Sequence, residues 1–258
     1  MLAFIHIPKT AGTTLHKIIS HQYPPEKIFI HHDSEGPPSP ELAKRINEAR
    51  PEIIMGHFSV GLHEFIPGLR YITCLRDPVG RIASHYRHAL NDSAHYLHRE
   101  ANSLSLADYA TSGLSGELSN GMTRMLAGMS DFHHDPVDEA TFQRAIRNME
   151  SHFDALIPTE RFDPAILQLA ENLGWRTPYY IRRKKGRGKA PRIDPQTRET
   201  IREANAFDCR LYDQAIQRNQ AETLSWNGAT AKVAAFQSRQ PLWGTAVFLG
   251  RELKRRLS

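Results

Sequence analysis

Short apolar runs recur along the first two thirds of the chain, each bounded by polar or turn-forming residues. Such runs are typical of strands that are buried on both faces. They are Leu2–Ile7, Lys27–Ile30, Glu52–Met55, Arg70–Leu75 and Phe153–Ile157. Segments with helical spacing of apolar residues separate them. Strands that alternate with helices predict an α/β fold with a mostly parallel central sheet, flanked by helices on both faces.

Several helix starts are marked by a capping side chain that precedes a proline. Proline suits the first helical position, and Ser or Asp before it can accept the free N–H groups of the first turn. The pairs are Ser39-Pro40, Asp77-Pro78, Asp163-Pro164 and Asp194-Pro195. Each predicts that a helix begins at its proline.

The pattern weakens after residue 220. We therefore expect one catalytic domain over residues 1–220, followed by a linker and a basic amphipathic tail helix within residues 221–258. The helical spacing of this tail rests on Leu242, Ala246, Leu249, Leu253 and Leu257. Such a helix suits packing against its own domain or a partner subunit, and peripheral membrane contact is the second reading.

Composition narrows the class of protein. With 40% hydrophobic and 24% charged residues, the chain reads as a globular protein, and it lacks the long apolar run of a membrane span. The first residues show no basic leader of a secretory signal, so we expect a cytoplasmic location. Cys74 and Cys209 match no zinc, redox or disulfide pattern and are expected to be buried thiols.

The net charge of +5 is unevenly distributed. Basic residues concentrate in one segment, at Arg182, Arg183, Lys184, Lys185, Arg187, Lys189 and Arg192. This density suits nucleic acid, a phosphorylated cofactor or an acidic polysaccharide equally well.

The loop after the first strand has the chemistry of an anion site. Pro8–Thr14 places one ammonium, small residues and hydroxyls before a helix expected over residues 13–22. A helix N-terminus offers free N–H groups and the positive end of its dipole to a phosphate or sulfate. The loop is not a Walker A motif, because Lys9 precedes its only glycine, and no G-x-G-x-x-G is present. An ATPase or a dinucleotide enzyme is therefore disfavoured.

A second anion site is predicted at the fourth strand. That strand delivers Arg76 to its carboxyl end, Asp77 caps the next helix, and Ser84 lies two turns into it. An Arg fork binds phosphate bidentately, and a Ser hydroxyl adds a directional donor.

Together the two elements resemble the PAPS-dependent sulfotransferase superfamily, where PAPS is 3′-phosphoadenylyl sulfate. The match is to the carbohydrate branch, which includes heparan sulfate 2-O-sulfotransferase and bacterial homologues, through motifs like His-x-Pro-Lys-Thr-Ala and Arg-Asp-Pro-x-x-Arg. The resemblance runs from about Phe4 to Tyr212 and implies a P-loop-NTPase-like sulfotransferase fold. It implies that Arg76 and Ser84 hold the 3′-phosphate. The implied contacts to the 5′-phosphosulfate are Lys9, Thr10, Ala11, Gly12, Thr13 and Thr14.

The resemblance also implies the reacting groups. His57, in Gly56-His57-Phe58, falls on the position of the general base, and an imidazole can accept a hydroxyl proton near neutral pH. Lys9 is implied as the second catalytic residue, because its charge stabilises the transferring group. The mammalian enzymes carry another His just before the glycine, where this chain has Met55.

Further contacts are implied less specifically. Lys184, Lys185 and Arg187 correspond in order to the loop that closes over the cofactor, although a solvated basic loop remains an alternative. Asn120 and Arg124 are candidates for the acceptor site. Histidines at 85, 88, 95 and 98 have metal-like spacing, but the family chemistry requires no metal and we expect none.

The resulting prediction is transfer of a sulfuryl group from PAPS to a hydroxyl of a carbohydrate or glycan. A P-loop-type kinase of small molecules is an alternative. Another is a non-catalytic module for anionic glycan or nucleic acid, which leaves Lys9, His57 and Arg76 without a shared purpose. We expect a carbohydrate partner and no nucleic acid, and leave the oligomeric state open.

Overall fold

A five-stranded parallel sheet forms the centre of the protein. The computed structural model describes residues 1–32, 37–129, 135–181 and 193–241. The strand order is β2-β3-β1-β4-β5, and every pair of neighbours is parallel. The strands are β1 (Leu2–Ile5), β2 (Ile28–His31), β3 (Ile53–Gly56), β4 (Arg70–Leu75) and β5 (Phe153–Pro158). All five predicted strands and the α/β fold class are confirmed.

The apolar strands are explained by burial on both sides. Successive side chains point to opposite faces, so Ala3 and Ile5 enter one core cluster whereas Leu2 and Phe4 enter another. Parallel sheets need this double cover, because their crossover helices lie on the faces.

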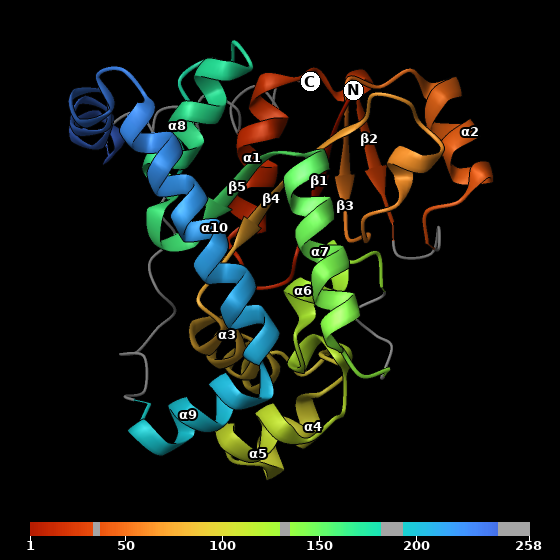
Figure 1. Cartoon of the computed structure of the whole chain (residues 1–258), viewed down its shortest axis with the longest axis vertical. Helices are drawn as coiled ribbons and strands as arrows, with labels where there is room; N and C mark the ends of the chain where they lie inside the picture. The colour runs from red at the N-terminus through yellow and green to blue at the C-terminus, as the bar shows by residue number, and fades with distance from the viewer. Residues whose placement is uncertain (33–36, 130–134, 182–192, 242–258) are drawn as a thin grey trace.

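Helices cover both faces of the sheet (Figure 1). Apolar residues of α1 (Gly12–Gln22) and α8 (Phe162–Asn172) pack on the face of Leu2 and Phe4. On the other face the core receives α2 (Pro40–Ala49), α6 (Gly121–Leu126), α7 (Glu139–His152) and α10 (Ala206–Ser225). Turns of 3-10 helix lie at Pro25–Lys27, Leu62–Glu64, Gly116–Leu118 and Thr159–Arg161.

A third core cluster lies beside the sheet. It joins the helices α3 (Pro78–Asn91), α4 (His98–Ser103), α5 (Leu106–Thr111) and α9 (Pro195–Ala204). Figure 1 shows these four helices together at the end of the molecule to which β4 leads. They therefore adjoin the carboxyl edge of the sheet.

Three of the four predicted cap-proline pairs start a helix. Ser39, Asp77 and Asp194 each accept a hydrogen bond from an amide of the first turn. The prediction at Asp163 is wrong, because α8 already begins at Phe162. Asp163 is buried inside the helix, where the Tyr180 hydroxyl donates to it at 2.5 Å. The Asp163 side chain therefore binds a tertiary partner and does not cap the helix.

The C-terminal part of the described chain is more regular than the sequence predicts. The expected boundary at residue 221 falls inside α10, and residues 229–241 form a further helix. This helix lies on α8, where Lys232 pairs with Glu171 and Gln237 donates to Asp163. The expected tail helix falls on residues 242–258, outside the described residues. Within the described ranges, no helix combines the length and apolarity needed to span a membrane.

Candidate active site

The carboxyl ends of three neighbouring strands bring the residues of interest together. Lys9 lies in the loop after β1, His57 directly follows β3, and Arg76 directly follows β4. Because β1 lies between β3 and β4, all three residues emerge at one edge. Parallel α/β sheets bind their ligands outside this edge.

The backbone of the β1 loop forms a concave array of amides. Lys9 and Ala11 have left-handed φ angles of 67° and 69°, whereas Thr10 between them does not have a positive φ. Alternation of this kind turns successive N–H groups toward a common point and makes an anion-binding nest. The positive end of the α1 dipole adds to it. A left-handed angle costs a non-glycine residue about 1–3 kcal/mol, so strain is stored where the anion is expected.

The hydroxyls of the loop do not all face the same way. Thr10 is fully buried and its hydroxyl donates to the Ile7 carbonyl at 2.8 Å, so this hydroxyl does not face an anion. Thr13 is exposed and Thr14 is half-buried at the start of α1. The Thr159 hydroxyl lies 3.1 Å from the Thr10 carbonyl oxygen, which ties the loop to the end of β5.

Two cations share this edge. The Arg76 Nη1 donates to the Lys9 carbonyl oxygen at 3.2 Å. Burial lowers the pKa of Lys9 and the pKa of Arg76, since desolvation disfavours both charged forms. An anion between the two groups would offset that cost. The first turn of α3 packs closely here, because a Cβ on Gly80 would lie 3.2 Å from Arg76 Nε. Ser84 lies further along α3 and is half-buried.

His57 is exposed, and its ring stacks on that of His6 with a centroid distance of 4.3 Å. The site therefore combines an anion loop, two cations and an imidazole that solvent-borne substrates can reach. The predicted contacts Lys184, Lys185 and Arg187 lie outside the described residues.

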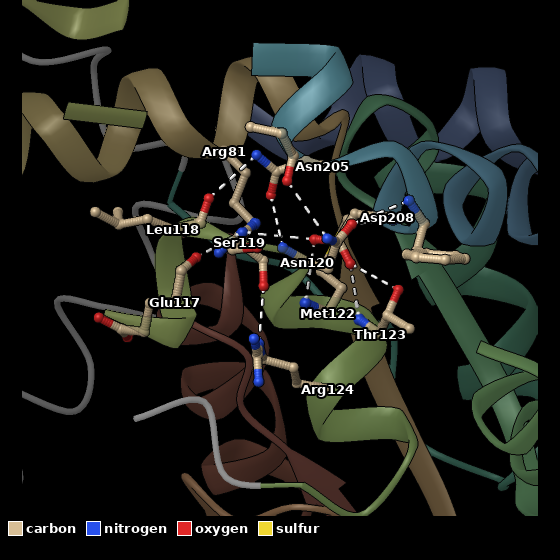
Figure 2. Close-up of polar contacts among 12 residues, drawn as sticks. Arg81, Glu117, Leu118, Ser119, Asn120, Met122, Thr123, Arg124, Asn205 and Asp208 are labelled. Carbon is tan, nitrogen blue, oxygen red and sulfur yellow. Dashed lines mark hydrogen bonds and ion pairs between the residues drawn. The ribbon is translucent and has the colours of Figure 1, made fainter. Parts of the chain in front are cut away.

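Asn120 and Arg124 require a correction. Figure 2 shows both in a buried polar network rather than on an open surface. Asn120 is 7% exposed, and its side-chain oxygen accepts from the amides of Phe207 and Asp208 at 3.0 and 3.1 Å. Arg124 is 3% exposed and donates to the Ser119 carbonyl at 2.9 Å. The structure thus assigns them to helix packing and not to the acceptor.

The network is a reciprocal cap between two helices. Asn120 directly precedes α6, yet its side chain caps α10. Asp208, in the first turn of α10, accepts from the amides of Met122 and Thr123 in α6 at 3.2 and 2.8 Å. Arg81, 1% exposed, adds an ion pair to Asp208 at 3.5 Å. Arg81, the second arginine of the Arg-Asp-Pro-x-x-Arg motif, therefore stabilises this buried network.

A buried polar cluster around Glu117, which no sequence pattern predicts, interacts electrostatically with Lys9. Glu117 is 5% exposed and receives hydrogen bonds from His85 and Tyr96. Burial alone raises the pKa of Glu117, but these hydrogen bonds and the charge of Arg81 outweigh it and lower the pKa to about 2. The resulting carboxylate is the charge that most favours protonated Lys9. No spacing in the sequence relates residue 117 to residue 9, so only the fold reveals the pair.

The histidines with metal-like spacing have other contacts. His85 Nδ1 lies 2.9 Å from the Tyr109 hydroxyl, and the ring of His95 lies edge-on to those of His85 and His88. Within the described residues, no group of three or more His, Cys, Asp or Glu side chains is arranged to hold a metal ion.

Comparison with known families bears on this arrangement. The model of the sulfotransferase family matches residues 1–214, which span all five strands. The chain belongs to the sulfotransferase family. Membership supports sulfuryl transfer as the reaction class and covers the whole candidate site, from Lys9 to Arg76.

The chain is also similar to a solved sulfotransferase from Alicyclobacillus acidocaldarius. The two are 16% identical, and the match covers 83% of this chain and 94% of that chain with a TM-score of 0.46. No curated protein sequence matches the chain. The helix at residues 229–241 lies beyond the part that the family model matches.

Proposed function

We propose that this sulfotransferase takes its sulfuryl group from PAPS and transfers it to a hydroxyl of a carbohydrate or glycan, with His57 as general base. The observation that carries the proposal is the shared sheet edge of Lys9, Arg76 and His57. It combines anion-binding groups with one imidazole exposed to solvent.

The proposed donor site fits a nucleotide that carries one anionic group at its 5′ position and another at its 3′ position. The nest at Lys9–Ala11 and the start of α1 suit the 5′-phosphosulfate, whereas Arg76 and Ser84 suit the 3′-phosphate. Lys9 and Arg76 are both partly buried, and both lose solvation in the free protein. A bound anion restores the lost favourable interaction, which is the electrostatic reason to expect tight binding here.

The chemistry is an in-line displacement. PAPS supplies the sulfuryl group, and 3′-phosphoadenosine 5′-phosphate is the leaving group. His57 accepts the proton of the acceptor hydroxyl while the oxygen forms its bond to sulfur and the bond from sulfur to the bridging oxygen breaks. Lys9 and the α1 amides stabilise the charge that grows on the leaving phosphate, which is the positioning and electrostatic logic of phosphoryl transfer.

The proposed acceptor site does not include Asn120 or Arg124, since both side chains are buried. Carbohydrate is proposed from the family branch that the sequence motifs resemble. The kinase alternative has a specific difficulty in this structure, because the loop lysine lies at Lys9, before α1, rather than inside the first turn where a Walker A lysine lies.

A mass-spectrometric screen of carbohydrate acceptors tests the proposal. Wild-type protein with PAPS should sulfate at least one hydroxylated acceptor, and Lys9→Ala should lower that rate, because it removes a charge from the donor site. ATP with magnesium is the parallel donor. Phosphorylated products from ATP, with no sulfated product from PAPS, would replace the proposal with the kinase.

A further inference from the structure

His6 is a half-buried imidazole with no role in the chemistry described above. It directly follows β1, and its amide donates to the Gly56 carbonyl at 2.8 Å. Ile5 and Gly56 are register partners in the parallel pair of β1 and β3. The next residues along the two strands, His6 and His57, are therefore side by side, and their rings stack at a centroid distance of 4.3 Å and an interplanar angle of 27°.

The ring of His6 is held from two further sides. It stacks on Phe4 within the strand, with a centroid distance of 5.6 Å. On another side the ring packs against Gly12, the first residue of α1, which has no side chain to occupy that space. A Cβ at Gly12 would lie 1.8 Å from His6 Cδ2. No other residue type fits at position 12 while the His6 ring stays in this place. The glycine of the anion loop is therefore required for the position of the His6 ring.

Burial keeps His6 neutral. Desolvation, followed by the charges of His57, His16 and Lys9, lowers its pKa to about 3. A general base becomes positively charged when it takes a proton, and a second charged imidazole in contact with it would oppose that step. A ring that stays neutral at working pH can remain stacked on His57 in both of its protonation states.

We propose that His6 is the positioning residue for His57: its ring, clamped between Phe4, Gly12 and His57, fixes the plane of the base at the sheet edge. The inference rests on the proposed function of His57.

Nuclear magnetic resonance of histidine-labelled protein tests the contact without any substrate. The ring protons of His57, assigned with His57→Gln, should be shifted upfield by the stacked ring in the wild type. That shift should disappear in His6→Ala and return in His6→Phe. The His6 ring should show no titration between pH 5 and pH 8. An unchanged His57 signal in His6→Ala, or a His6 titration near neutral pH, overturns the proposal.

Turnover separates positioning from simple packing. With PAPS and the acceptor found by screening, His6→Ala should lower kcat by roughly 10- to 100-fold, since small misplacements of a reacting group are costly. The affinity for 3′-phosphoadenosine 5′-phosphate should stay within about twofold, and His6→Phe should recover most of the lost rate. His63→Ala is the matched control, because His63 contacts Tyr71 near the opposite edge of the sheet.

Two results would overturn the proposal at this stage. One is wild-type turnover in His6→Ala. The other is a loss of nucleotide affinity and melting temperature in parallel with the rate, which identifies His6 as a packing residue only. If the wild-type protein itself transfers nothing from PAPS, the proposed function fails instead, and the resonance measurement still decides whether His6 holds the His57 ring.

Discussion

At the scale of single residues, His57 carries the proposed proton transfer. His57→Ala removes only that step, so turnover should fall by roughly 10²- to 10⁴-fold. Because the His57 side chain is exposed and its ring stacks on that of His6, its removal should change the melting temperature and the nucleotide affinity little. Turnover, affinity and melting temperature are measured on one preparation. Turnover close to wild type in a folded variant would rule out His57 as the base.

Arg76 makes a different contribution. It binds rather than reacts, and Arg76→Ala should weaken binding of 3′-phosphoadenosine 5′-phosphate by about 2 to 3 kcal/mol through the loss of a charge-assisted contact. Calorimetric titration of the variant measures this. Arg70→Ala is a suitable control, because Arg70 lies at the other end of β4 and pairs with Asp154. Equal affinities of Arg76→Ala and wild type would contradict a 3′-phosphate site.

The sequence places Lys9, His57 and Arg76 together because their positions follow from the strands. His57 and Arg76 directly follow β3 and β4, and Lys9 lies in the loop after β1, so a parallel sheet brings all three to one edge. Their roles remain predictions. The sequence did not anticipate the burial of Asn120 and Arg124. The Asn120 side chain caps α10 from more than eighty residues away, and Arg124 donates to the Ser119 carbonyl. Their burial depends on tertiary packing, which has no local signal in the sequence. Glu117 was missed for the same reason.

At the scale of elements, the reciprocal cap between α6 and α10 explains why Asn120 is where it is. Asn120→Ala removes the acceptor for two α10 amides and places alanine at a left-handed φ of 54°. The free energy of unfolding should fall by about 2 to 4 kcal/mol. Asn120→Gly loses the same cap without the backbone cost, so it should be less destabilising. Denaturant unfolding measures both variants, and an acceptor KM that rises with no loss of stability would restore Asn120 to the acceptor site.

Protonation of the buried Glu117 carboxylate should make the free energy of unfolding depend on pH. Its folded pKa, about 2, is below the value of about 4.3 for an unfolded chain. Its contribution to stability is therefore complete above the unfolded value and is lost as the pH falls through the folded value. Glu117→Gln should lose less stability than wild type when the pH is lowered from 6 to 3. Identical pH dependence of the two unfolding free energies would contradict this assignment.

The elements themselves were predictable to the extent that their signals are local. Apolar runs identified all five strands, and Ser39, Asp77 and Asp194 correctly marked helix starts. Asp163 looked the same in the sequence, but Tyr180 and Gln237 bind its carboxylate inside the helix. The sequence predicts a linker in the region of the helix at residues 229–241, because the contacts that stabilise this helix are with α8 and leave no local signal.

At the scale of the whole molecule, the fold brings three separate segments to one edge and surrounds that edge with the α3, α4, α5 and α9 cluster. The family model covers this arrangement. The helix at residues 229–241 lies outside it and packs along α8, with Phe236 3% exposed and stacked on Tyr179. The candidate site thus lies within the part of the chain that the family model matches, and the helix at residues 229–241 lies beyond it.

The central claim is that the edge binds a nucleotide through its 3′-phosphate as well as its 5′ end. Thermal unfolding with 3′-phosphoadenosine 5′-phosphate, compared with AMP, tests it most directly. At a concentration of about 100 times its Kd, the former should stabilise the folded state by about 2.7 kcal/mol and raise Tm by roughly 5 to 10 °C. AMP at the same concentration should raise Tm by about 3 °C or less. Equal shifts from the two nucleotides would contradict the account.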